Sequence, residues 1–573
     1  MSSTAVAPRQ QALRLVPAGL ALLFVALAVV GGVRAYSPVP FWDMWGSYLP
    51  FMDYAAESGW HAWWTQHNEH RIVLARLLFW SDLRWFDGAG WFLIVANYAL
   101  VALAAAFFCR LLGEVEAPAG RAADMRALKF SVVAWLFFWS QHENLTWAFQ
   151  SQFFLAQLLP LAALYTLYRS LKGGAAVFAL ACLLGVLSVG TMANGVLALP
   201  LMTAYAALTR QGLRRTGVLA LLAGLALFAY FHDYLAPAGH GSLAGALLGH
   251  PLKFAGYVLN YLGSPFHFAF GARGIGRAAA LLASLFFVAS AARFAARYLR
   301  QPRQAAFQLA LLFFIAYVAG TAFGTAGGRL VFGLSQALSP RYTTPALMAW
   351  AALMVLYAPA LLALQERRRR MAWGAFAVLA LLMLAYQLRA LQSKADDLFD
   401  RSVAALAIEL RIKDQEAIGH VAPDTGVIEV AAQAADRQRS VFGLYPYRGA
   451  REAMGAVFRP ASLPACQGAL DSAVVVHGDE GYLRVTGWLY EAGRRAVPQV
   501  VRILDAEGRQ RGYALGGNDG NAAQAALHKA SHLAGYRGYL SAEAGGQALT
   551  LRGEGPQGAV CELKVKAPVA QRE

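Results

Sequence analysis

The sequence predicts a mostly α-helical membrane protein, a polytopic bundle of about 11–12 transmembrane helices followed by a C-terminal extracytoplasmic β-sandwich. Three observations predict this fold. Hydrophobic residues make up 58% of the 573 residues and charged residues only 14%, against roughly a quarter charged in ordinary soluble domains. Apolar runs of membrane-spanning length recur through residues 1–390. From about residue 466, short alternating runs between Gly-rich turns replace them.

The charge distribution indicates membrane topology and argues against nucleic-acid binding. The formal net charge is +17. Residues 391–573 carry 21 basic and 21 acidic side chains, so the whole excess lies in residues 1–390, between the apolar runs. Basic side chains in that position are typical of the cytoplasmic loops of membrane proteins, whereas a nucleic-acid groove would gather them on one face.

Eleven segments approximate the roughly 20 apolar residues that a spanning helix needs. These are 13–33, 90–113, 127–141, 152–171, 174–190, 193–209, 214–234, 277–298, 304–324, 342–364 and 371–390. The first has no convincing cleavage site and is expected to remain as a helix. Residues 251–270 are expected to be re-entrant or interfacial, because a twelfth span there would place four arginines between residues 293 and 303 outside.

The positive-inside rule then sets the orientation. With the N-terminus in the cytoplasm, 19 of the 29 basic residues before residue 391 fall on the cytoplasmic side. Eleven spans place the C-terminus outside. The sequence therefore predicts a multi-pass protein of the bacterial inner membrane with a periplasmic C-terminal domain.

The domain organisation follows from this topology. Residues 1–390 form the membrane domain, with an unusually long outer loop at 36–89, and residues 391–465 form an extracytoplasmic helical linker. Residues 466–573 form the β-sandwich, whose function as a carbohydrate-binding domain or a structural cap stays open. Cys466 and Cys561 lie at its two ends and could form a disulfide in an oxidising periplasm.

The outer loop opens with PFWDMWGSY, in which Asp43 follows Trp42. Aromatic neighbours can desolvate a carboxylate, which suits a general base. The alternative is an aromatic belt at the membrane interface that carries an incidental Asp.

Further along the same loop, TQHNEHRIVLAR places His67, Glu69, His70 and Arg71 together. On a helix, His67, His70 and Arg71 would share one face. That arrangement could hold a metal, bind a phosphate or hydrogen-bond to a sugar, although the order of residues is not that of a zincin. No cofactor is therefore predicted and a divalent metal stays open. The alternative is a solvated helix start.

Two further outer segments carry polar groups among aromatics. SQHENLTWAFQSQFF contains His142, Glu143, Gln150 and Gln152, a mixture that suits carbohydrate, unless these residues only cap a helix and anchor it at the interface. SPRYTTPA contains Arg341 and Tyr342.

Arg341 lies outside against the positive-inside bias, so a phosphate is its natural partner and pairing with an outer acid is the alternative. Arg329 is a weaker candidate of the same kind. The loop that carries His232, Asp233, His240 and His250 could cover a site.

With these motifs, the chain resembles the GT-C superfamily of integral membrane glycosyltransferases, which use polyprenyl-phosphate sugars. The resemblance covers roughly residues 13–390 and is to the bacterial branch of aminoarabinose, arabinosyl and pilin glycosyltransferases. It rests on the early acid in FWDMW and on R-Y-x-x-P at an outer helix start (Arg341, Tyr342, Pro345). Paired acids are usual in the family. Here Met44 follows Asp43, so the adjacent pair is absent and the resemblance implies that Glu69 stands in as the second acid.

The resemblance implies a glycosyltransferase that inverts the anomeric carbon, with Asp43 as base and Glu69 as a second catalytic acid. The implied donor-phosphate residues are Arg341, Tyr342, Arg71 and His70. The implied sugar and acceptor residues are His67, His142, Glu143, Gln150, Gln152 and Trp42.

The expected partners are a polyprenyl-phosphate-linked sugar, membrane lipids and a glycan, glycolipid or pilin-like acceptor. A neutral sugar such as arabinose is favoured. Two alternatives are an O-antigen polymerase or ligase, which relies on arginines in a late outer loop, and a non-enzymatic flippase or transporter, which should carry charges within its spans.

Overall fold

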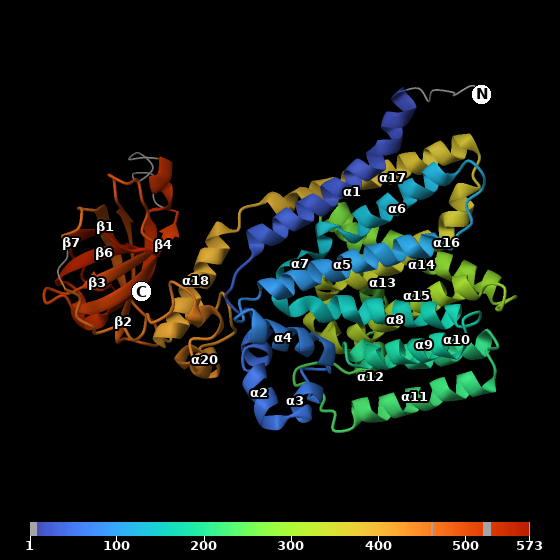
Figure 1. The fold of residues 1–573 in the computed structure, drawn as a ribbon, viewed down its shortest axis with the longest axis horizontal. Coiled ribbons are helices and arrows are strands. Elements are labelled where there is room, and N and C mark those ends of the chain that lie inside the picture. The colour runs from blue at the N-terminus through green and yellow to red at the C-terminus, as the bar shows by residue number, and fades with distance from the viewer. Residues whose placement is uncertain (1–7, 460–461, 520–528, 572–573) are drawn as a thin grey trace. The chain divides into compact units, whose positions relative to one another are not determined.

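A computed structural model describes residues 8–459, 462–519 and 529–571 of the chain (Figure 1). The chain divides into two compact units. Unit one comprises Met1–Arg34, Ser58–Leu78 and Leu93–Gln392, and unit two comprises Ala35–Glu57, Phe79–Phe92 and Ser393–Glu573. Two stretches of the predicted outer loop therefore group with the C-terminal part of the chain and not with the membrane domain.

Unit one is a helical bundle whose members pack as sequence neighbours, with α8 beside α9, α10 beside α11 and α13 beside α14 (Figure 1). The helices that lie wholly or partly in it are α1 (Pro8–Ala35), α3 (Trp60–Trp64), α4 (Val73–Trp85), α5 (Trp91–Leu112), α6 (Ala122–Leu136), α7 (His142–Thr146), α8 (Ser151–Arg169), α9 (Gly174–Val189), α10 (Ala198–Leu208), α11 (Leu213–Phe231), α12 (Leu243–Gly249), α13 (Pro251–Ala269), α14 (Gly274–Tyr298), α15 (Ala306–Arg329), α16 (Thr343–Leu362) and α17 (Glu366–Gln387).

Within the described residues, seven helical segments are long and apolar enough to cross a membrane. They are Val16–Ala35, Trp91–Leu112, Leu213–Phe231, Gly274–Tyr298, Ala306–Phe332, Pro340–Leu362 and Glu366–Leu391. These helices are consistent with the predicted membrane protein, but their number is below the expected 11–12. Helices α6, α9 and α10 are shorter, with 15, 16 and 11 residues. Residues 251–270, expected to be re-entrant or interfacial, form the single continuous helix α13.

Burial separates the inner helices of the bundle from the outer ones. About 67% of the apolar window of Ala306–Phe332 and 72% of that of Pro340–Leu362 is buried, against 17% for Leu213–Phe231 and Glu366–Leu391. A helix that is apolar all round and buried belongs in the core. The outer helices expose Leu221, Phe228 and Leu381, as expected for helices that face lipid.

Unit two begins with a π-helical turn (Met44–Tyr48) and α2 (Phe51–Ser58) and continues with α18 (Ala395–Leu410), α19 (Gln415–Ile418) and α20 (Val427–Asp436). Ion pairs join these distant stretches: Asp53 pairs with Arg437 at 2.7 Å and with Arg439 at 2.8 Å. The buried Asp82 accepts hydrogen bonds from the Tyr48 hydroxyl and from the Gly90 backbone N–H. The start of the predicted outer loop is thus an integral part of this unit.

The C-terminal strands form one antiparallel sheet of seven strands within the described residues. They are β1 (Gln467–Val475), β2 (Tyr482–Tyr490), β3 (Val500–Leu504), β4 (Gln510–Asn518), β5 (Gly535–Ser541), β6 (Ala548–Gly555) and β7 (Gly558–Lys566), in the order β1-β2-β5-β4-β3-β6-β7. The sequence predicts a β-sandwich here; the antiparallel sheet confirms the β-rich domain but does not by itself establish a sandwich. Alternation along a strand predicts one buried face but does not determine whether that face meets a second sheet or its own curled interior.

The two edge strands of this sheet are joined. Cys466 and Cys561 form a disulfide with a Cα–Cα distance of 5.3 Å. The Cys466 N–H donates to the Glu562 carbonyl and the Glu562 N–H donates to the Pro464 carbonyl, both at 2.9 Å. The disulfide and these bonds hold the start of β1 against β7, so the sheet closes around its apolar side chains.

Replacing both disulfide cysteines with serine is expected to lower the free energy of unfolding of unit two by about 2–5 kcal/mol. The cross-link spans 95 residues, and closing so long a loop restricts the unfolded chain strongly. Urea unfolding followed by limited proteolysis of the C-terminal part measures the change. A Cys109→Ser variant, altered in unit one, is the control. An unchanged midpoint in the double variant, with the wild-type bond shown to be oxidised by mass spectrometry, contradicts this prediction.

Glu409 makes unit two sensitive to pH. Its side chain is buried in α18, and burial, with Glu452 and Asp436 nearby, raises the pKa of Glu409 from 4.5 to about 7. The folded state therefore binds this proton more tightly than the unfolded state. The stabilisation is fully present below about pH 4.5 and is lost as the pH rises through 7.

We expect Glu409→Gln, which mimics the protonated acid, to stabilise the protein by about 1–2 kcal/mol at pH 8 and to have little effect at pH 5. Thermal unfolding of the full chain at the two pH values measures the difference. The exposed Glu480 provides the control variant Glu480→Gln. Equal stabilisation at both pH values contradicts the prediction.

Candidate functional site

The predicted site residues fall into three groups. Trp42 and Asp43 belong to unit two. The turn around Glu69 and the two segments that carry Glu143 and Arg341 belong to unit one.

Asp43 begins the π-helical turn Met44–Tyr48 and is half-buried. The carbonyl of Val421 accepts hydrogen bonds from the Trp42 N–H (2.8 Å) and from Nε1 of Trp45 (3.2 Å), which fixes the backbone on both sides of the acid. Trp42 has a φ of +49° and a 46% exposed side chain. A bulky residue in this strained backbone region is uncommon and often marks a functional site.

Residues 67–70 form a tight turn, so the helical arrangement considered for His67, His70 and Arg71 is absent. The N–H of His67 donates to the carbonyl of His70 at 2.7 Å, and the N–H of His70 donates back at 2.8 Å. Asn68 has a φ of +48°, a left-handed conformation that asparagine tolerates better than most residues. His67, His70 and Arg71 therefore do not share a helix face, and Glu69 lies at the tip of the turn.

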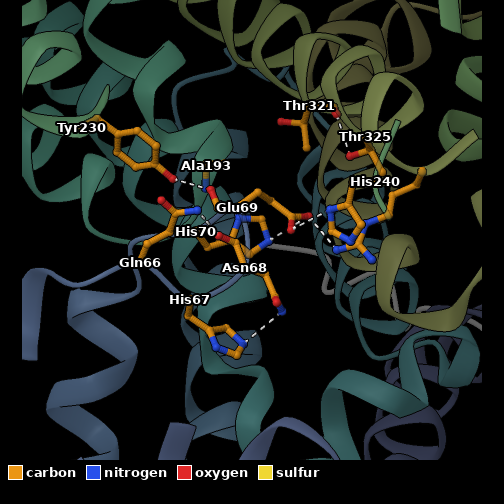
Figure 2. A network of polar contacts seen from close by, with 11 residues as sticks. Gln66, His67, Asn68, Glu69, His70, Ala193, Tyr230, His240, Thr321 and Thr325 are labelled. Carbon is orange, nitrogen blue, oxygen red and sulfur yellow. Dashed lines mark hydrogen bonds and ion pairs between the residues drawn. The ribbon is translucent and has the colours of Figure 1, made fainter. Parts of the chain in front are cut away.

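Glu69 is the centre of a polar cluster drawn from separate parts of unit one (Figure 2). Its Oε1 accepts a hydrogen bond from Nη2 of Arg329 at 2.6 Å, at the end of α15. Nδ1 of His240 lies 3.5 Å from Oε2, and Nε2 of His70 lies 3.6 Å from Oε1. The Tyr230 hydroxyl donates to the Glu69 carbonyl at 2.8 Å.

The cluster holds Glu69 ionised and His70 neutral. Burial opposes ionisation of Glu69, but the adjacent His70 and Arg329 outweigh it and lower its pKa to about 2. Burial lowers the pKa of His70 to about 4 despite the opposing effect of Glu69. Because the Ala193 N–H donates to Nδ1 of His70 at 3.1 Å, the ring proton of the neutral form lies on Nε2 and faces Glu69.

Arg71, which the resemblance implied as a donor-phosphate residue, donates to three backbone carbonyls. Its Nε, Nη1 and Nη2 donate to the carbonyls of Tyr230 (2.9 Å), Trp64 (2.7 Å) and His232 (2.7 Å). The side chain is 4% exposed. These bonds tie the Glu69 turn to the end of α11, so we assign Arg71 to positioning the turn and leave it out of the phosphate site proposed below.

Arg341 pairs with Glu143, one of the acids that the sequence places on the outer face, which is the alternative to a phosphate partner. Its Nη1 lies 3.3 Å from Oε1 of Glu143, and Oγ of Ser339 donates to Oε2 of the same carboxylate at 3.3 Å. Nδ2 of Asn144 donates to the Arg341 carbonyl at 2.8 Å. The adjacent Tyr342 ring stacks on Tyr261 with centroids 5.3 Å apart.

The segment 142–153 connects the Glu69 turn with the Arg341 segment. The His67 ring contacts Phe149 with centroids 5.2 Å apart, and Phe153 contacts Tyr342 at 6.4 Å. His142 stacks on Trp139 with centroids 5.8 Å apart, and its Nδ1 is 3.2 Å from the Trp139 carbonyl. All three polar segments predicted on the outer face of the membrane domain are therefore linked by contacts within unit one.

Buried oxygens without a hydrogen-bond partner gather in the same region of the described chain. They are Oδ1 of Asn144, Oε1 of Gln150, Oγ of Ser151, Oε1 of Gln152 and Oε1 of Gln157. The fully buried hydroxyl of Tyr257 also has no partner and interacts electrostatically with both Arg329 and Arg341. Since buried polar groups are normally paired, such a concentration indicates a place for water or a polar ligand.

Sequence reasoning underweighted three residues of this region. Arg329 and His240 were secondary candidates because they are isolated in the sequence, and Tyr257 lies in a segment read only for its membrane topology. Among the described residues, no group of three or more His, Cys, Asp or Glu side chains is arranged to hold a metal ion. Comparison of the chain with protein-family models, with curated proteins and with solved structures found no match.

Proposed function

We propose that the protein is a membrane glycosyltransferase that moves a sugar from a polyprenyl-phosphate donor to an envelope glycan, lipid or protein. The observation that carries the proposal is Tyr257, whose buried, unpaired hydroxyl lies within electrostatic range of Arg329 and Arg341. Hydroxyl and guanidinium groups are the kinds of donor from which a phosphate accepts hydrogen bonds. A phosphate ester of a lipid fits a site carried by a bundle of apolar helices.

In the proposed reaction, an acceptor hydroxyl attacks the anomeric carbon of the sugar. The new C–O bond forms as the bond to the phosphate oxygen breaks, with inversion, and polyprenyl phosphate leaves with the electron pair. The resemblance alone gives Asp43 the role of the base that accepts the acceptor's proton. Arg341 and Arg329 stabilise the charge that grows on the departing phosphate.

Glu69 is a poor choice for the base. A pKa of about 2 makes it a weak proton acceptor at neutral pH, and catalysis favours a base whose pKa lies near the working pH. Glu69 is better suited to orient Arg329 and to accept a hydrogen bond from a sugar hydroxyl through Oε2, which has no hydrogen-bond partner among the described groups. Gln150 and Gln152 would offer their unpaired amide oxygens to other hydroxyls.

The proposed location is the bacterial inner membrane, with the N-terminus in the cytoplasm and unit two in the periplasm. The excess of basic residues before residue 391 supports this orientation. The Cys466–Cys561 disulfide supports an oxidising compartment for unit two. Phosphatase fused to the C-terminus is expected to be active; an inactive fusion that cytoplasmic reagents can label contradicts this topology.

The full chain, reconstituted in liposomes, tests the function when it is supplied with a polyprenyl-phosphate sugar and an acceptor extract. We expect free polyprenyl phosphate and glycosylated acceptor in equal amounts. Consumption of only pyrophosphate-linked oligosaccharides would favour a polymerase or ligase. Movement of the intact lipid-linked sugar across the bilayer without consumption would favour a flippase.

Tyr257→Phe separates a ligand site from ordinary packing. Removing a buried hydroxyl that has no partner should leave stability unchanged or increase it. If the hydroxyl binds donor phosphate, the same change should raise the KM for the donor about five- to tenfold. Donor titration and thermal unfolding together measure both effects. A donor KM equal to that of the wild type would remove Tyr257 from the phosphate site.

A further inference from the structure

A polar pocket of about 260 Å³ lies within unit two, between α18, α19 and one face of the sheet. Residues on β2 alternate, so Val485 enters the apolar interior of the sheet while Thr486 faces the pocket. The strand register sets Ser472 of β1 and Arg537 of β5 on either side of Thr486. Three neighbouring strands thus present polar side chains to one cavity.

Arg484, which lines the pocket, belongs to a cluster of hydrogen-bonded side chains. Arg484 donates through Nε and Nη2 to both oxygens of Asp414, at 3.0 and 2.7 Å. The Tyr539 hydroxyl donates to the same carboxylate at 2.8 Å, and the Ala417 N–H donates at 3.1 Å. The Asp414 side chain is only 1% exposed. These bonds hold the side chain of Arg484 in one position, and a binding site benefits from side chains that are fixed in advance.

The guanidinium and carboxylate groups that line the pocket are all held in ion pairs. Nη1 of Arg537 lies 2.6 Å from Oδ1 of Asp400, and Arg484 also pairs with Glu416. Nδ1 of His420 lies 3.9 Å from Oδ2 of Asp400, beyond hydrogen-bond distance. An anionic ligand such as a phosphate would be repelled by the carboxylates of Asp400 and Glu416. A cationic ligand would be repelled by the guanidinium groups of Arg484 and Arg537. The pocket therefore favours a neutral ligand.

We propose that this pocket binds a neutral polyhydroxylated ligand, namely one sugar unit of a glycan. Sugar hydroxyls both donate and accept hydrogen bonds, and the pocket offers both kinds of partner. Asp400 and Glu416 accept, Arg537 donates, and the hydroxyls of Ser472 and Thr486, 2.6 Å apart, do either. The pocket lies inside one unit and its ligand does not depend on the transfer reaction proposed above.

Direct binding to the full chain in lipid nanodiscs tests the proposal. Nanodiscs are required because detergents with sugar headgroups would compete for the pocket. The probes are methyl glycosides of arabinose, galactose and glucose, with glucuronate and inorganic phosphate as anionic comparisons, and saturation-transfer NMR provides the readout. No lipid-linked donor is present, so a failed transfer assay leaves the result standing.

We expect at least one neutral glycoside to bind and both anions to fail. His420→Ala, at a side chain 42% exposed, and Ser472→Ala should each weaken that binding about five- to tenfold, the loss of one hydrogen bond. Thr550→Val, on β6 and away from the pocket, should not change it. Binding of the anions alone, binding unchanged in both pocket variants, or no binding of any glycoside overturns the proposal.

Discussion

Asp43→Asn is expected to reduce sugar transfer by about 10²–10⁴-fold, the usual contribution of a general base. Asparagine has nearly the same shape as aspartate but cannot accept the proton of the attacking hydroxyl at neutral pH. The backbone around residue 43 is held by the Val421 carbonyl and not by the carboxylate, so we expect the fold to persist. Donor consumption by the reconstituted full chain measures the loss.

Glu69→Gln is the matched comparison for this variant. Glutamine keeps a hydrogen-bond acceptor for Arg329 but loses the charge, so we expect a smaller loss, expressed mainly in the KM for the donor or acceptor. Thermal unfolding checks that both variants are folded. An Asp43→Asn protein that transfers sugar at the wild-type rate, beside an inactive Glu69→Gln protein, would move the base to Glu69 and contradict the assignment.

Arg341→Ala is expected to reduce kcat/KM for the lipid-linked sugar by about 10²–10³-fold. Losses of this size are typical when an enzyme loses a hydrogen-bonding group that stabilises developing negative charge. Arg341→Lys should retain part of the activity, because lysine keeps the charge and loses the planar fork of donors. The measurement is a titration of polyprenyl-phosphate sugar at a fixed acceptor concentration.

The ion pair with Glu143 supplies the control for Arg341. If Arg341 served only to pair with Glu143 at 3.3 Å, then Glu143→Gln should lower donor use and thermal stability as much as Arg341→Ala does. If Arg341 binds phosphate, Glu143→Gln leaves the guanidinium available and donor use should stay near the wild-type value or improve. Equal damage from both variants, with a matching fall in thermal stability, would identify a structural ion pair.

The membrane character of the chain was predictable, but the lengths of its helices were not. Composition alone distinguishes a bundle of apolar helices from a soluble domain, and the seven long apolar helices agree with it. The residues that follow α6 and α9 form short turns before the next helix, at Trp139–Gln141 and Ala193–Leu197. A count of apolar residues cannot detect such breaks, because the turn residues there are themselves largely apolar or small.

The candidate site was predictable in its parts and not in its connections. The sequence identified Glu69, Glu143 and Arg341 from their positions between apolar runs. It did not predict that Arg329, 260 positions beyond Glu69, would pair with that acid, since pairing depends on how α15 packs. Residues His67–His70 form a turn, in which Asn68 adopts a left-handed backbone and the two histidines exchange backbone hydrogen bonds.

The grouping of the outer loop also depended on tertiary structure. Hydropathy assigned residues 36–89 to the membrane domain, whereas Ala35–Glu57 and Phe79–Phe92 pack into unit two. Contacts such as that of Asp53 with Arg439 join residues nearly four hundred positions apart. Hydropathy and motifs within a short stretch of sequence cannot predict such contacts. Within the β-rich part, by contrast, the short alternating runs predicted from about residue 466 do form strands, β1 to β7.

The most direct test of the central claim is the mass of envelope glycans and glycoproteins from cells that lack this protein. The same cells carrying the wild-type chain or the Asp43→Asn variant complete the comparison. If the protein is a glycosyltransferase, each acceptor from the cells that lack it should be lighter by one neutral sugar residue, a pentose if the sugar is arabinose. Only the wild-type chain should restore that mass. Unchanged masses, or the loss of whole repeat units in place of single sugars, would contradict the account.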